Sequence, residues 1–463
     1  MYFEQFYLGC LAHASYLLVS GGEAVVVDPQ RDVDIYLEAA KKHNATIRHI
    51  FETHLHADFV SGHKELAQRT GARIYIGPNG GATVAHVEVR DGFELKVGSV
   101  NIAVLETPGH TPESICLLIT DEEKSSEPWA ILTGDTLFVG DVGRPDLSKA
   151  FAPPALAGML YDSLHSKILT LPDHVMVYPG HGAGSLCGRN LGTSRSSTIG
   201  TEKLTNYALQ IKRREDFIQQ LTSNLPPRPE YFPQDAQINR AGATAIADLP
   251  ELKPVAAEEL KSLLEKGGIV VDVRRTDDFA AAHVPGSINI PLDGQFASWA
   301  GTLIGLKSQP VLIADSPEQL SEARVRLARI GLDEEHGYLQ GGTTGWRKAG
   351  FELASIEKIT ARNLEQQLDS DRIQVLDVRR QPEWQAGHVE GAVFHPLDDF
   401  KAAMPQVDRN KQVAVICKSG YRSMIACSLL LRAGFEKVAV VDGGFDAWQK
   451  ANLPAVSETP ALA

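Results

Sequence analysis

The chain has 463 residues, a length that predicts about three domains. Its hydrophobic share of 43% and charged share of 22% are those of an ordinary globular protein. The net charge is −13 and no block of lysines or arginines stands out, which argues against nucleic acid and anionic membranes as partners. No apolar run is long enough to span a membrane, and the first residues lack the basic and apolar regions of a secretory signal.

The cysteine content indicates a reducing compartment. The five cysteines are few, odd in number and scattered, so a disulfide framework is not expected. We therefore expect a cytoplasmic protein in which one or two thiols are available for chemistry.

Four apolar runs in the first part of the chain each lead into a turn that carries polar residues. The runs predict buried strands, and Gly or Pro usually marks the turn that follows. If these strands end at one edge of a sheet, their polar residues converge there and form a metal site. The runs are Ile47–Phe51, Ile102–Leu105, Trp129–Leu132 and Val175–Tyr178, and the polar residues that follow them are His54, His110, Asp135 and His181.

The same residues carry a resemblance to a known family. His54, His56 and Asp58 stand at the spacing of the His-x-His-x-Asp-His motif of the metallo-β-lactamase superfamily, and the later His, Asp and His follow in the family's order. The resemblance covers residues 1–235 and implies an αββα sandwich. Binuclear members have a histidine where this chain has Phe59, and a phenyl ring cannot bind a metal ion.

The change at Phe59 favours one branch of that superfamily. Two-zinc hydrolases such as glyoxalase II would lose a ligand, whereas the chain is similar to the mononuclear persulfide dioxygenases. In that branch the resemblance implies one metal ion held by His54, His110 and Asp135. Two imidazoles and a carboxylate suit Fe(II) that holds a substrate sulfur and O₂, but they also suit catalytic zinc, so the ligand types alone do not decide.

Three further polar residues of the same turns have two interpretations. His56, Asp58 and His181 either orient the ligands and contact substrate or remain from a vacant second metal position. The residue types leave both interpretations open.

Two loops beside the predicted site carry further candidates. The resemblance implies that Arg144, in the segment 140–146, meets the anionic group of a carrier thiol, and the alternative is a surface ion pair. The loop 182–200 is rich in Gly, Ser and Thr, and we expect it to form a lid or a wall of the site. Cys187 in this loop either carries sulfur or is inert.

The second half of the chain contains an internal repeat. Residues 270–274 match residues 375–379, and residues 282–286 match residues 387–391. A period of roughly one hundred residues is too long for a solenoid and fits two copies of a whole domain. Each copy alternates apolar strands with helices, which predicts a parallel α/β sheet.

The proline-rich stretch Leu225–Pro233 marks the first domain boundary. The predicted organisation is a domain similar to the persulfide dioxygenases at 1–235, a linker at 236–252, and the two repeated domains at 253–355 and 356–463.

The second copy carries a reactive thiol. An apolar strand, 413–416, leads into Cys417 and a Gly-bearing loop, and a helix follows. Backbone N–H groups at a helix N-terminus cradle an anion and lower the pKa of a cysteine placed there. The loop resembles the rhodanese active loop, since a tyrosine-phosphatase loop has one more residue between Cys and Arg. The resemblance gives Cys417 as the nucleophile, Arg422 as a positive charge at the rim, and Lys418, Ser419, Gly420 and Tyr421 as the substrate-binding loop.

The first copy lacks this thiol. Counting back from Gly331, which matches Gly434, Ala314 stands where Cys417 does, and no cysteine occurs in the first copy. We therefore predict that the first copy is a catalytically inactive rhodanese-like domain and serves in spacing, docking or assembly.

The order of the three domains resembles the persulfide dioxygenase–rhodanese fusions of sulfide detoxification. The resemblance implies that Fe(II), with O₂ as co-substrate, oxidises a persulfide of glutathione, coenzyme A or bacillithiol to sulfite. Cys417 would then carry sulfane sulfur that gives or consumes thiosulfate. We also expect a homo-oligomer, with no nucleic-acid or membrane partner.

Three other functions remain open. The chain could be a zinc thioesterase of the glyoxalase II kind, which Phe59 disfavours. It could be a sulfurtransferase whose front domain only binds sulfur species. It could also be a sulfide sensor with Cys417 as the sensing thiol, although an acidic chain without a DNA-reading element disfavours that function.

Overall fold

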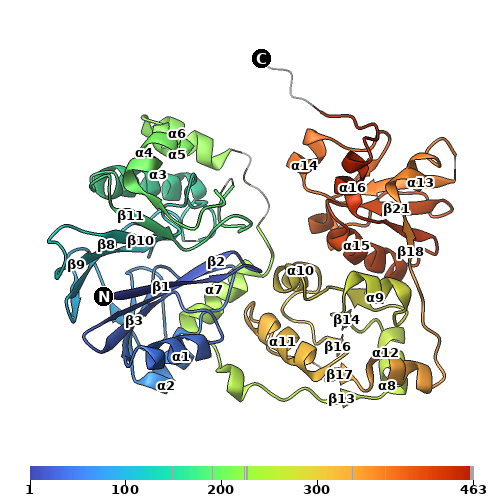
Figure 1. The fold of residues 1–463 in the computed structure, drawn as a ribbon, viewed down its shortest axis with the longest axis horizontal. Helices are drawn as coiled ribbons and strands as arrows, with labels where there is room; N and C mark the ends of the chain where they lie inside the picture. Colours follow the sequence, from blue (N-terminus) through green and yellow to red (C-terminus); the bar gives the residue numbers. More distant parts are fainter. Residues whose placement is uncertain are drawn as a thin grey trace. The chain divides into compact units, whose positions relative to one another are not determined.

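The computed structural model describes residues 1–148, 150–189, 191–223, 225, 228–335, 337–370 and 372–458. The chain forms two compact units, Met1–Leu249 with Ala328–Gly331 and Pro250–Leu327 with Leu332–Ala463 (Figure 1). Among the described residues, no helix is long and apolar enough to cross a membrane. Pro226 and Pro227 of the predicted boundary lie outside the described residues.

A six-stranded sheet forms one layer of the first unit. Its strands lie in the order β1-β2-β3-β4-β5-β6, antiparallel as far as β3 and parallel from there on. Helices α1 (Asp34–Lys42) and α2 (His63–Thr70) pack on its outer face through Leu17, Val26 and their neighbours. The strands are β1 (Tyr2–Leu8), β2 (His13–Ser20), β3 (Glu23–Val27), β4 (Thr46–Glu52), β5 (Arg73–Ile76) and β6 (Val87–Glu88).

A second six-stranded sheet forms the other inner layer. Its order is β12-β11-β10-β9-β8-β7, and only β10 and β11 run parallel. Its strands are β7 (Glu94–Val97), β8 (Val100–Glu106), β9 (Ile115–Asp121), β10 (Ala130–Gly134), β11 (Met176–Pro179) and β12 (Ser197–Thr198). The helices of this part are α3 (Pro153–Ser163) with the π-helical turn Leu164–Ile168, α4 (Ile199–Thr205), α5 (Tyr207–Gln210), α6 (Arg214–Thr222) and α7 (Phe232–Ala241).

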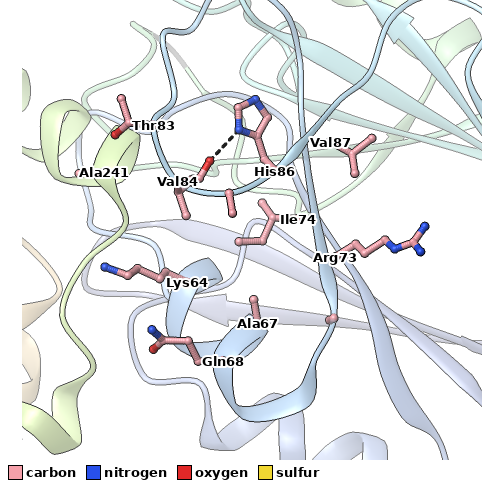
Figure 2. A pocket seen from close by; sticks show the side chains of 12 residues that line it. Lys64, Ala67, Gln68, Arg73, Ile74, Thr83, Val84, His86, Val87 and Ala241 are labelled. Atoms are coloured by element: carbon pink, nitrogen blue, oxygen red, sulfur yellow. Dashed lines mark hydrogen bonds between the residues drawn. The ribbon is translucent and has the colours of Figure 1, made fainter.

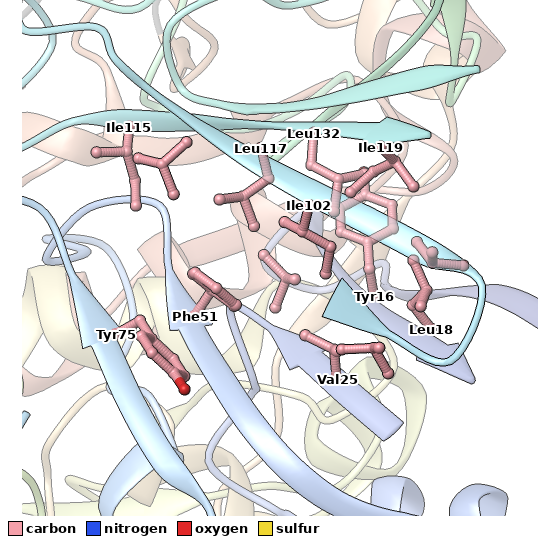
Figure 3. Close-up of a cluster of buried hydrophobic side chains, with 14 of the residues drawn as sticks. Tyr16, Leu18, Val25, Phe51, Tyr75, Ile102, Ile115, Leu117, Ile119 and Leu132 are labelled. Atoms are coloured by element: carbon pink, nitrogen blue, oxygen red, sulfur yellow. The ribbon is translucent and has the colours of Figure 1, made fainter. Parts of the chain in front are cut away.

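The main core of the first unit lies between the two sheets (Figure 3). Alternate residues of β2 point to opposite faces, so Tyr16 and Leu18 enter this core while Leu17 packs under the helices. Phe51 from one sheet and Leu117 from the other lie in the same cluster. The layers are helix, sheet, sheet and helix, which is the predicted αββα sandwich.

The second unit contains two copies of one parallel α/β arrangement. The sheet orders are β13-β17-β16-β14-β15 and β18-β22-β21-β19-β20, so the topology repeats strand for strand. The first copy contains β13 (Pro254–Val255), α8 (Ala257–Glu265), β14 (Val270–Asp272), α9 (Thr276–Ala281), β15 (Ile288–Asn289), α10 (Phe296–Leu303), β16 (Val311–Ile313), α11 (Pro317–Ala328), β17 (Gly337–Leu339) and α12 (Gly342–Lys348). The second contains β18 (Glu357–Ile359), α13 (Ala361–Glu365), β19 (Ile373–Asp377), α14 (Gln381–Ala386), β20 (Val393–Phe394), β21 (Gln412–Ile416), α15 (Tyr421–Arg432), β22 (Val438–Val441) and α16 (Gly444–Lys450).

A buried ion pair repeats with the fold. Arg274 donates to Asp272 in the first copy, and Arg379 donates to Asp377 in the second, with the closest contacts at 2.7 and 2.6 Å. Both aspartates are fully buried at the ends of β14 and β19. The repeated Asp-Val-Arg sequence is therefore a structural feature of each copy, since a buried carboxylate needs such a partner.

The structure differs from the predicted linker at 236–252. The helix α7 occupies 232–241, and its residues Ala236 and Asn239 are buried in the first unit, which extends to Leu249. The proline-rich composition of the preceding stretch indicates a stiff turn but does not show that the chain folds back afterwards.

We expect Phe51→Ala to lower the free energy of unfolding of the first unit by about 3–5 kcal/mol, because truncation leaves a cavity between the sheets. Urea-dependent hydrogen exchange of the β4 amides measures this change. The exposed Leu204→Ala is the control, and we expect it to change stability by less than about 0.5 kcal/mol. Equal stabilities of the two variants would contradict the packing described.

Candidate functional site

The ends of four strands carry the polar residues that the sequence singled out. His54 follows β4, His110 follows β8, Asp135 follows β10 and His181 follows β11. The strands come from two sheets rather than one, because β4 belongs to the first sheet and the other three to the second. The polar turns meet at one edge of the sandwich, so the predicted convergence is found although the assumption of a single sheet is wrong.

His54, His110 and Asp135 lie together with one donor atom each within 4.8 Å of the others. The Oδ2 atom of Asp135 is 3.8 Å from His54 Nε2 and 3.4 Å from His110 Nε2. All three side chains are buried. Burial lowers the pKa of both imidazoles, so at neutral pH they are in the uncharged form that binds a metal ion.

The other atoms of the two imidazoles fix their orientation. His110 Nδ1 is 2.9 Å from the carbonyl oxygen of Arg144, and His54 Nδ1 is 3.1 Å from the hydroxyl of Thr53. Within the described part of the chain, His54 Nε2 and Asp135 Oδ2 have no hydrogen-bond partner. Leaving these atoms buried and unpaired is costly, and a metal ion held between them would satisfy both.

His181 lies beside this group and bridges two carboxylates. Its Nδ1 is 2.8 Å from Asp135 Oδ1, and its Nε2 is 2.8 Å from Asp58 Oδ2. Burial alone would lower the pKa of His181, but Asp135 and Asp58 raise it well above its usual value. His181 is therefore an imidazolium bonded to both carboxylates, and it holds Asp135 in place beside His54 and His110.

Cys187 reaches the same edge of the sandwich. Its sulfur lies within 4.8 Å of donor atoms of Asp58 and His181, and the side chain is buried. Burial, reinforced by the charges of Asp58 and Asp135, raises the pKa of the Cys187 thiol well above its usual value. The group is a thiol rather than a thiolate at neutral pH, so it is a poor nucleophile in this environment.

The ring of His56 lies 4.1 Å from that of His54, between centroids, but its Nε2 is near two carboxylates outside the group formed by His54, His110 and Asp135. Its Nε2 is 3.1 Å from Asp28 Oδ1 and 3.6 Å from Glu52 Oε2. The ring of Phe59 lies 4.4 Å from the ring of His56, between centroids. The sequence alone left the orientation of His56 open, and the structure pairs it with carboxylates.

Arg144 is already bound by neighbouring groups. Its guanidinium donates two hydrogen bonds to Asp146, of 2.7 and 2.9 Å, and one to the carbonyl oxygen of Leu186. Its backbone N–H donates to the carbonyl oxygen of Cys187. Arg144 thus joins two loops of the site, and an anionic substrate would have to compete with Asp146. Its role in substrate binding stays a prediction.

Two residues that the sequence did not reveal hold the His54–Ser61 loop. The Nδ2 of Asn239, on α7, donates to the carbonyl oxygens of His56 and Phe59, at 2.8 Å each. Asp28 accepts the backbone N–H and the hydroxyl of Thr53 at 2.7 and 2.8 Å. The run Val25–Val27 before Asp28 repeats the strand-then-carboxylate pattern and could have signalled Asp28, whereas no local pattern signals Asn239.

The second predicted site lies in the last third of the chain. Cys417 follows β21, and its sulfur accepts the N–H of Gly420 at 3.1 Å and the hydroxyl of Ser423 at 3.3 Å. Gly420 has a φ of 113°, a conformation that side chains rarely adopt. Cys417 is buried, whereas Lys418 and Ser419 are exposed. The sulfur therefore lies inside the loop and accepts two hydrogen bonds, while the outer residues of the loop face the solvent.

Two side chains at the rim of this loop have partners. Arg422 forms a bidentate ion pair with Glu383, at 2.7 Å for both bonds. The hydroxyl of Tyr421 donates to the carbonyl oxygen of Pro291 in the first copy, at 2.9 Å. Tyr421 thus links the active loop to the inactive copy, and this contact gives the first copy a structural role in the second site.

The register of the sheets aligns the two copies at the cysteine. Asp272 pairs with Ile313 in the first copy, and Asp377 pairs with Ile416 in the second. The next residues are Ala314 and Cys417, as the sequence predicted. A methyl group cannot accept sulfur, so the first copy lacks the nucleophile.

A further pocket of about 670 Å³ lies in the first unit, between α2 and the segment 83–87 (Figure 2). Lys64, Arg73 and His86 line it, and Lys64 Nζ donates to the carbonyl oxygen of Gly242. No predicted site residue lines this pocket, so it is separate from both sites described above.

The molecule is thus an αββα sandwich with buried imidazole and carboxylate donors, followed by two parallel α/β copies, one of which has a thiol loop. Residues 8–181 match the metallo-beta-lactamase superfamily, and residues 256–349 and 360–451 each match the rhodanese-like domain. The metallo-beta-lactamase of Staphylococcus aureus subsp. aureus COL is 35% identical and aligns over 73% of this chain and 98% of its own, with a TM-score of 0.66.

Two other proteins are similar to part of this chain. The hydroxyacylglutathione hydrolase of Francisella tularensis subsp. novicida (strain U112) is 33% identical over 172 residues, which are 37% of this chain and 63% of that hydrolase. The chain thus spans less than two thirds of the length of that relative. ETHE1 from Myxococcus xanthus is 34% identical and aligns over 53% of this chain and 100% of its own, with a TM-score of 0.46.

The chain belongs to the metallo-beta-lactamase superfamily. Its metallo-beta-lactamase domain is followed by two rhodanese-like domains, so the predicted fold class is confirmed. These domains indicate an enzyme, and the superfamily fold together with the buried donor groups indicates metal binding.

We expect His110→Ala to lower the metal content per chain at least about tenfold, because it removes one of the three donors that face a common point. Mass spectrometric metal analysis of the purified variant measures this. His49→Ala is the matched control, since His49 is a half-buried histidine that bonds to Tyr75 in the first sheet. Unchanged metal content in His110→Ala would place the metal elsewhere.

Proposed function

We propose that the chain is a bifunctional sulfur enzyme, an iron-dependent persulfide dioxygenase joined to a sulfurtransferase. In the first reaction the S–S bond of a persulfide R–S–SH breaks and the thiol R–SH is released. The terminal sulfur leaves as sulfite, with two oxygens from O₂ and one from water. The electrons that the sulfur loses are taken up by O₂, and two protons are released.

The observation that carries this proposal is the donor set of the first unit. Two imidazoles and one carboxylate face a common point, and His56 is paired with Asp28 instead of joining them. Phe59 stands where binuclear relatives have a histidine. A three-donor face leaves coordination positions open, which favours a mononuclear ferrous centre over a zinc pair.

The residues present fit such an ion. His54, His110 and Asp135 would hold it, and when bound, Fe(II) supplies open positions and the electron-transfer chemistry that joins a sulfur anion to O₂. His181 keeps Asp135 oriented through the bond between His181 Nδ1 and Asp135 Oδ1. Burial of the whole group excludes bulk water, which strengthens the interactions of the donors with an anionic substrate.

In the second unit, Cys417 would accept the terminal sulfur of the persulfide and transfer it to sulfite. The Cys417 thiolate attacks the terminal sulfur of R–S–SH, the S–S bond of the substrate breaks and R–SH leaves. Sulfite then attacks the outer sulfur of the Cys417 persulfide and forms thiosulfate, while the new S–S bond breaks and returns the thiolate. The N–H of Gly420 and the hydroxyl of Ser423 support the negative charge at each stage.

The partners follow from this chemistry. The carrier is a low-molecular-weight thiol such as glutathione, coenzyme A or bacillithiol, which are compounds of a reducing cytoplasm. Sulfite and thiosulfate are the other small molecules of the cycle. Assembly into a homo-oligomer is part of the same proposal.

A second candidate function has one observation in its favour. The 33% identity with a hydroxyacylglutathione hydrolase is consistent with thioester hydrolysis at a zinc centre. Phe59 disfavours it, because a phenyl ring removes one donor for a second metal ion, whereas Asp58, His181 and Cys187 form a second group of buried donor atoms within 4.8 Å of one another.

Oxygen uptake with glutathione persulfide, run beside thioester hydrolysis with S-lactoylglutathione, separates the two functions. We expect persulfide-dependent O₂ consumption with sulfite as product, and no thioester cleavage above background. Thioester turnover in the absence of O₂ uptake would overturn the proposal.

We expect Cys417→Ser to leave persulfide-dependent O₂ uptake unchanged and to shift the final product from thiosulfate to sulfite, because only the sulfane-sulfur acceptor is removed. Chromatography of the labelled anions measures this ratio. Cys427→Ser is the matched control, since Cys427 is a buried cysteine in α15 that lies outside the loop. Thiosulfate formation at the wild-type rate in Cys417→Ser would show that Cys417 does not carry the sulfur.

A further inference from the structure

His13 is a buried histidine at the candidate metal centre that neither the motif nor the fold explains. It begins β2, and its backbone pairs with that of His181. The neighbouring bonds from Ala14 N to Gly180 O and from Gly182 N to Ala12 O, at 2.8 and 2.9 Å, fasten the two segments together. His13 therefore has a fixed place next to the loop that follows β11.

The ring of His13 is enclosed by side chains of the same edge. Its centroid is 3.9 Å from that of Phe59, 5.6 Å from that of His181 and 5.7 Å from that of His56. His181 in turn is bonded to Asp135. The imidazole thus lies one side chain away from the donor set, over the phenyl ring that replaces a metal ligand.

Among the described residues, the two nitrogens of this ring lack partners, whereas His56 and His63, which also have no hydrogen bond at either nitrogen, each have a carboxylate within 3.3 Å. His13 is 1% exposed, and neither Nδ1 nor Nε2 has a hydrogen-bond partner among the residues that the structure describes. A buried polar group without a partner destabilises a fold, and a phenyl or leucyl side chain at this position would avoid that loss. A ligand that enters the site would supply the missing partner.

The form of the imidazole indicates what that ligand is. Burial, together with the neighbouring His181 imidazolium, lowers the pKa of His13 well below its usual value, so the ring is neutral and carries one N–H. The donor atoms of His54, His110 and Asp135 would hold a metal ion, and an anionic sulfur would bind to that ion. The neutral His13 ring can donate a hydrogen bond to an anion at this position. Because the ring is uncharged, it does not form an ion pair with Asp135 or Asp58 that the anion would have to displace.

We propose that His13 is a substrate-binding residue of the first unit, whose N–H donates a hydrogen bond to the anionic terminal sulfur of the persulfide. This inference rests on the proposed dioxygenase function. The contact between the His13 and Phe59 rings fixes the imidazole plane, so the phenyl group in place of a second metal ligand has a positive role. His13 then does with a hydrogen bond what a second metal ion does by coordination in binuclear relatives.

The test uses hydrosulfide, the simplest anionic sulfur ligand, and the full-length protein loaded with Co(II). Absorption in the near ultraviolet reports the binding of sulfur to the metal. We expect His13→Phe to weaken hydrosulfide binding by about tenfold or more, since a hydrogen bond to a charged group is lost. His13→Gln keeps an N–H donor and should lose less affinity than His13→Phe.

Two further measurements give this test its controls. Metal content should be the same in wild type and both variants, and the metal-free His13→Phe protein should melt no lower than wild type, because an unpaired buried imidazole is removed. His49→Phe, at a half-buried histidine elsewhere in the first sheet, should leave hydrosulfide affinity unchanged.

Each remaining outcome has a definite meaning. Wild-type affinity for hydrosulfide in His13→Phe overturns the inference. Loss of metal in both His13 variants also overturns it, because His13 would then act on metal binding and not on the sulfur. If the wild-type protein binds hydrosulfide in a His13-dependent way yet consumes no O₂ with persulfide, the proposed function fails while the role of His13 in binding sulfur stands.

Discussion

The structure of the first unit depends on the burial of a cluster of polar groups at one edge of an apolar sandwich. Asp135 is at its centre, with His54, His110 and His181 all within 3.8 Å of its oxygens. Taking a carboxylate out of water is costly unless positive charge surrounds it. His181 supplies one positive charge through its hydrogen bond to Asp135 Oδ1. The other oxygen, Oδ2, has no hydrogen-bond partner among the described residues and lies near His54 and His110, where a bound metal ion would supply a second positive charge. The strand ends, the glycine turns and the loop contacts all serve to hold this group in position.

In the proposed function, persulfide oxidation and sulfur transfer occur on one chain and both act on persulfides. The first unit uses buried nitrogen and oxygen donors, and the second uses a thiol in a loop of backbone N–H groups. The first copy, in which alanine stands at the cysteine position, contacts the second site through the bond between Tyr421 and Pro291. In the proposed function, the sulfite made in one unit is the acceptor for sulfur in the other, which would give the fusion a chemical reason.

Sequence patterns predicted the strand ends, the repeat and the thiol loop, because each depends on residues close together in the chain. The choice of His54, His110 and Asp135 as ligands came from the family resemblance and stays a prediction. The patterns did not predict which sheet β4 joins, since an apolar run does not reveal its neighbour. The sequence analysis assigned Asn239 to a linker. Its hydrogen bonds to the carbonyl oxygens of His56 and Phe59 join residues that are far apart in the chain, and no local pattern reveals such bonds. The pairing of Arg144 with Asp146 and the unpaired nitrogens of His13 are likewise facts of packing that no local pattern shows.

The central claim is that one ferrous ion is bound by two imidazoles and one carboxylate, without His56. X-ray absorption spectroscopy of the protein purified without oxygen and without added metal tests it most directly. The account predicts an iron edge, a first shell fitted by two imidazole nitrogens with oxygen donors, and no metal–metal vector. A zinc edge with a second metal scatterer would contradict it.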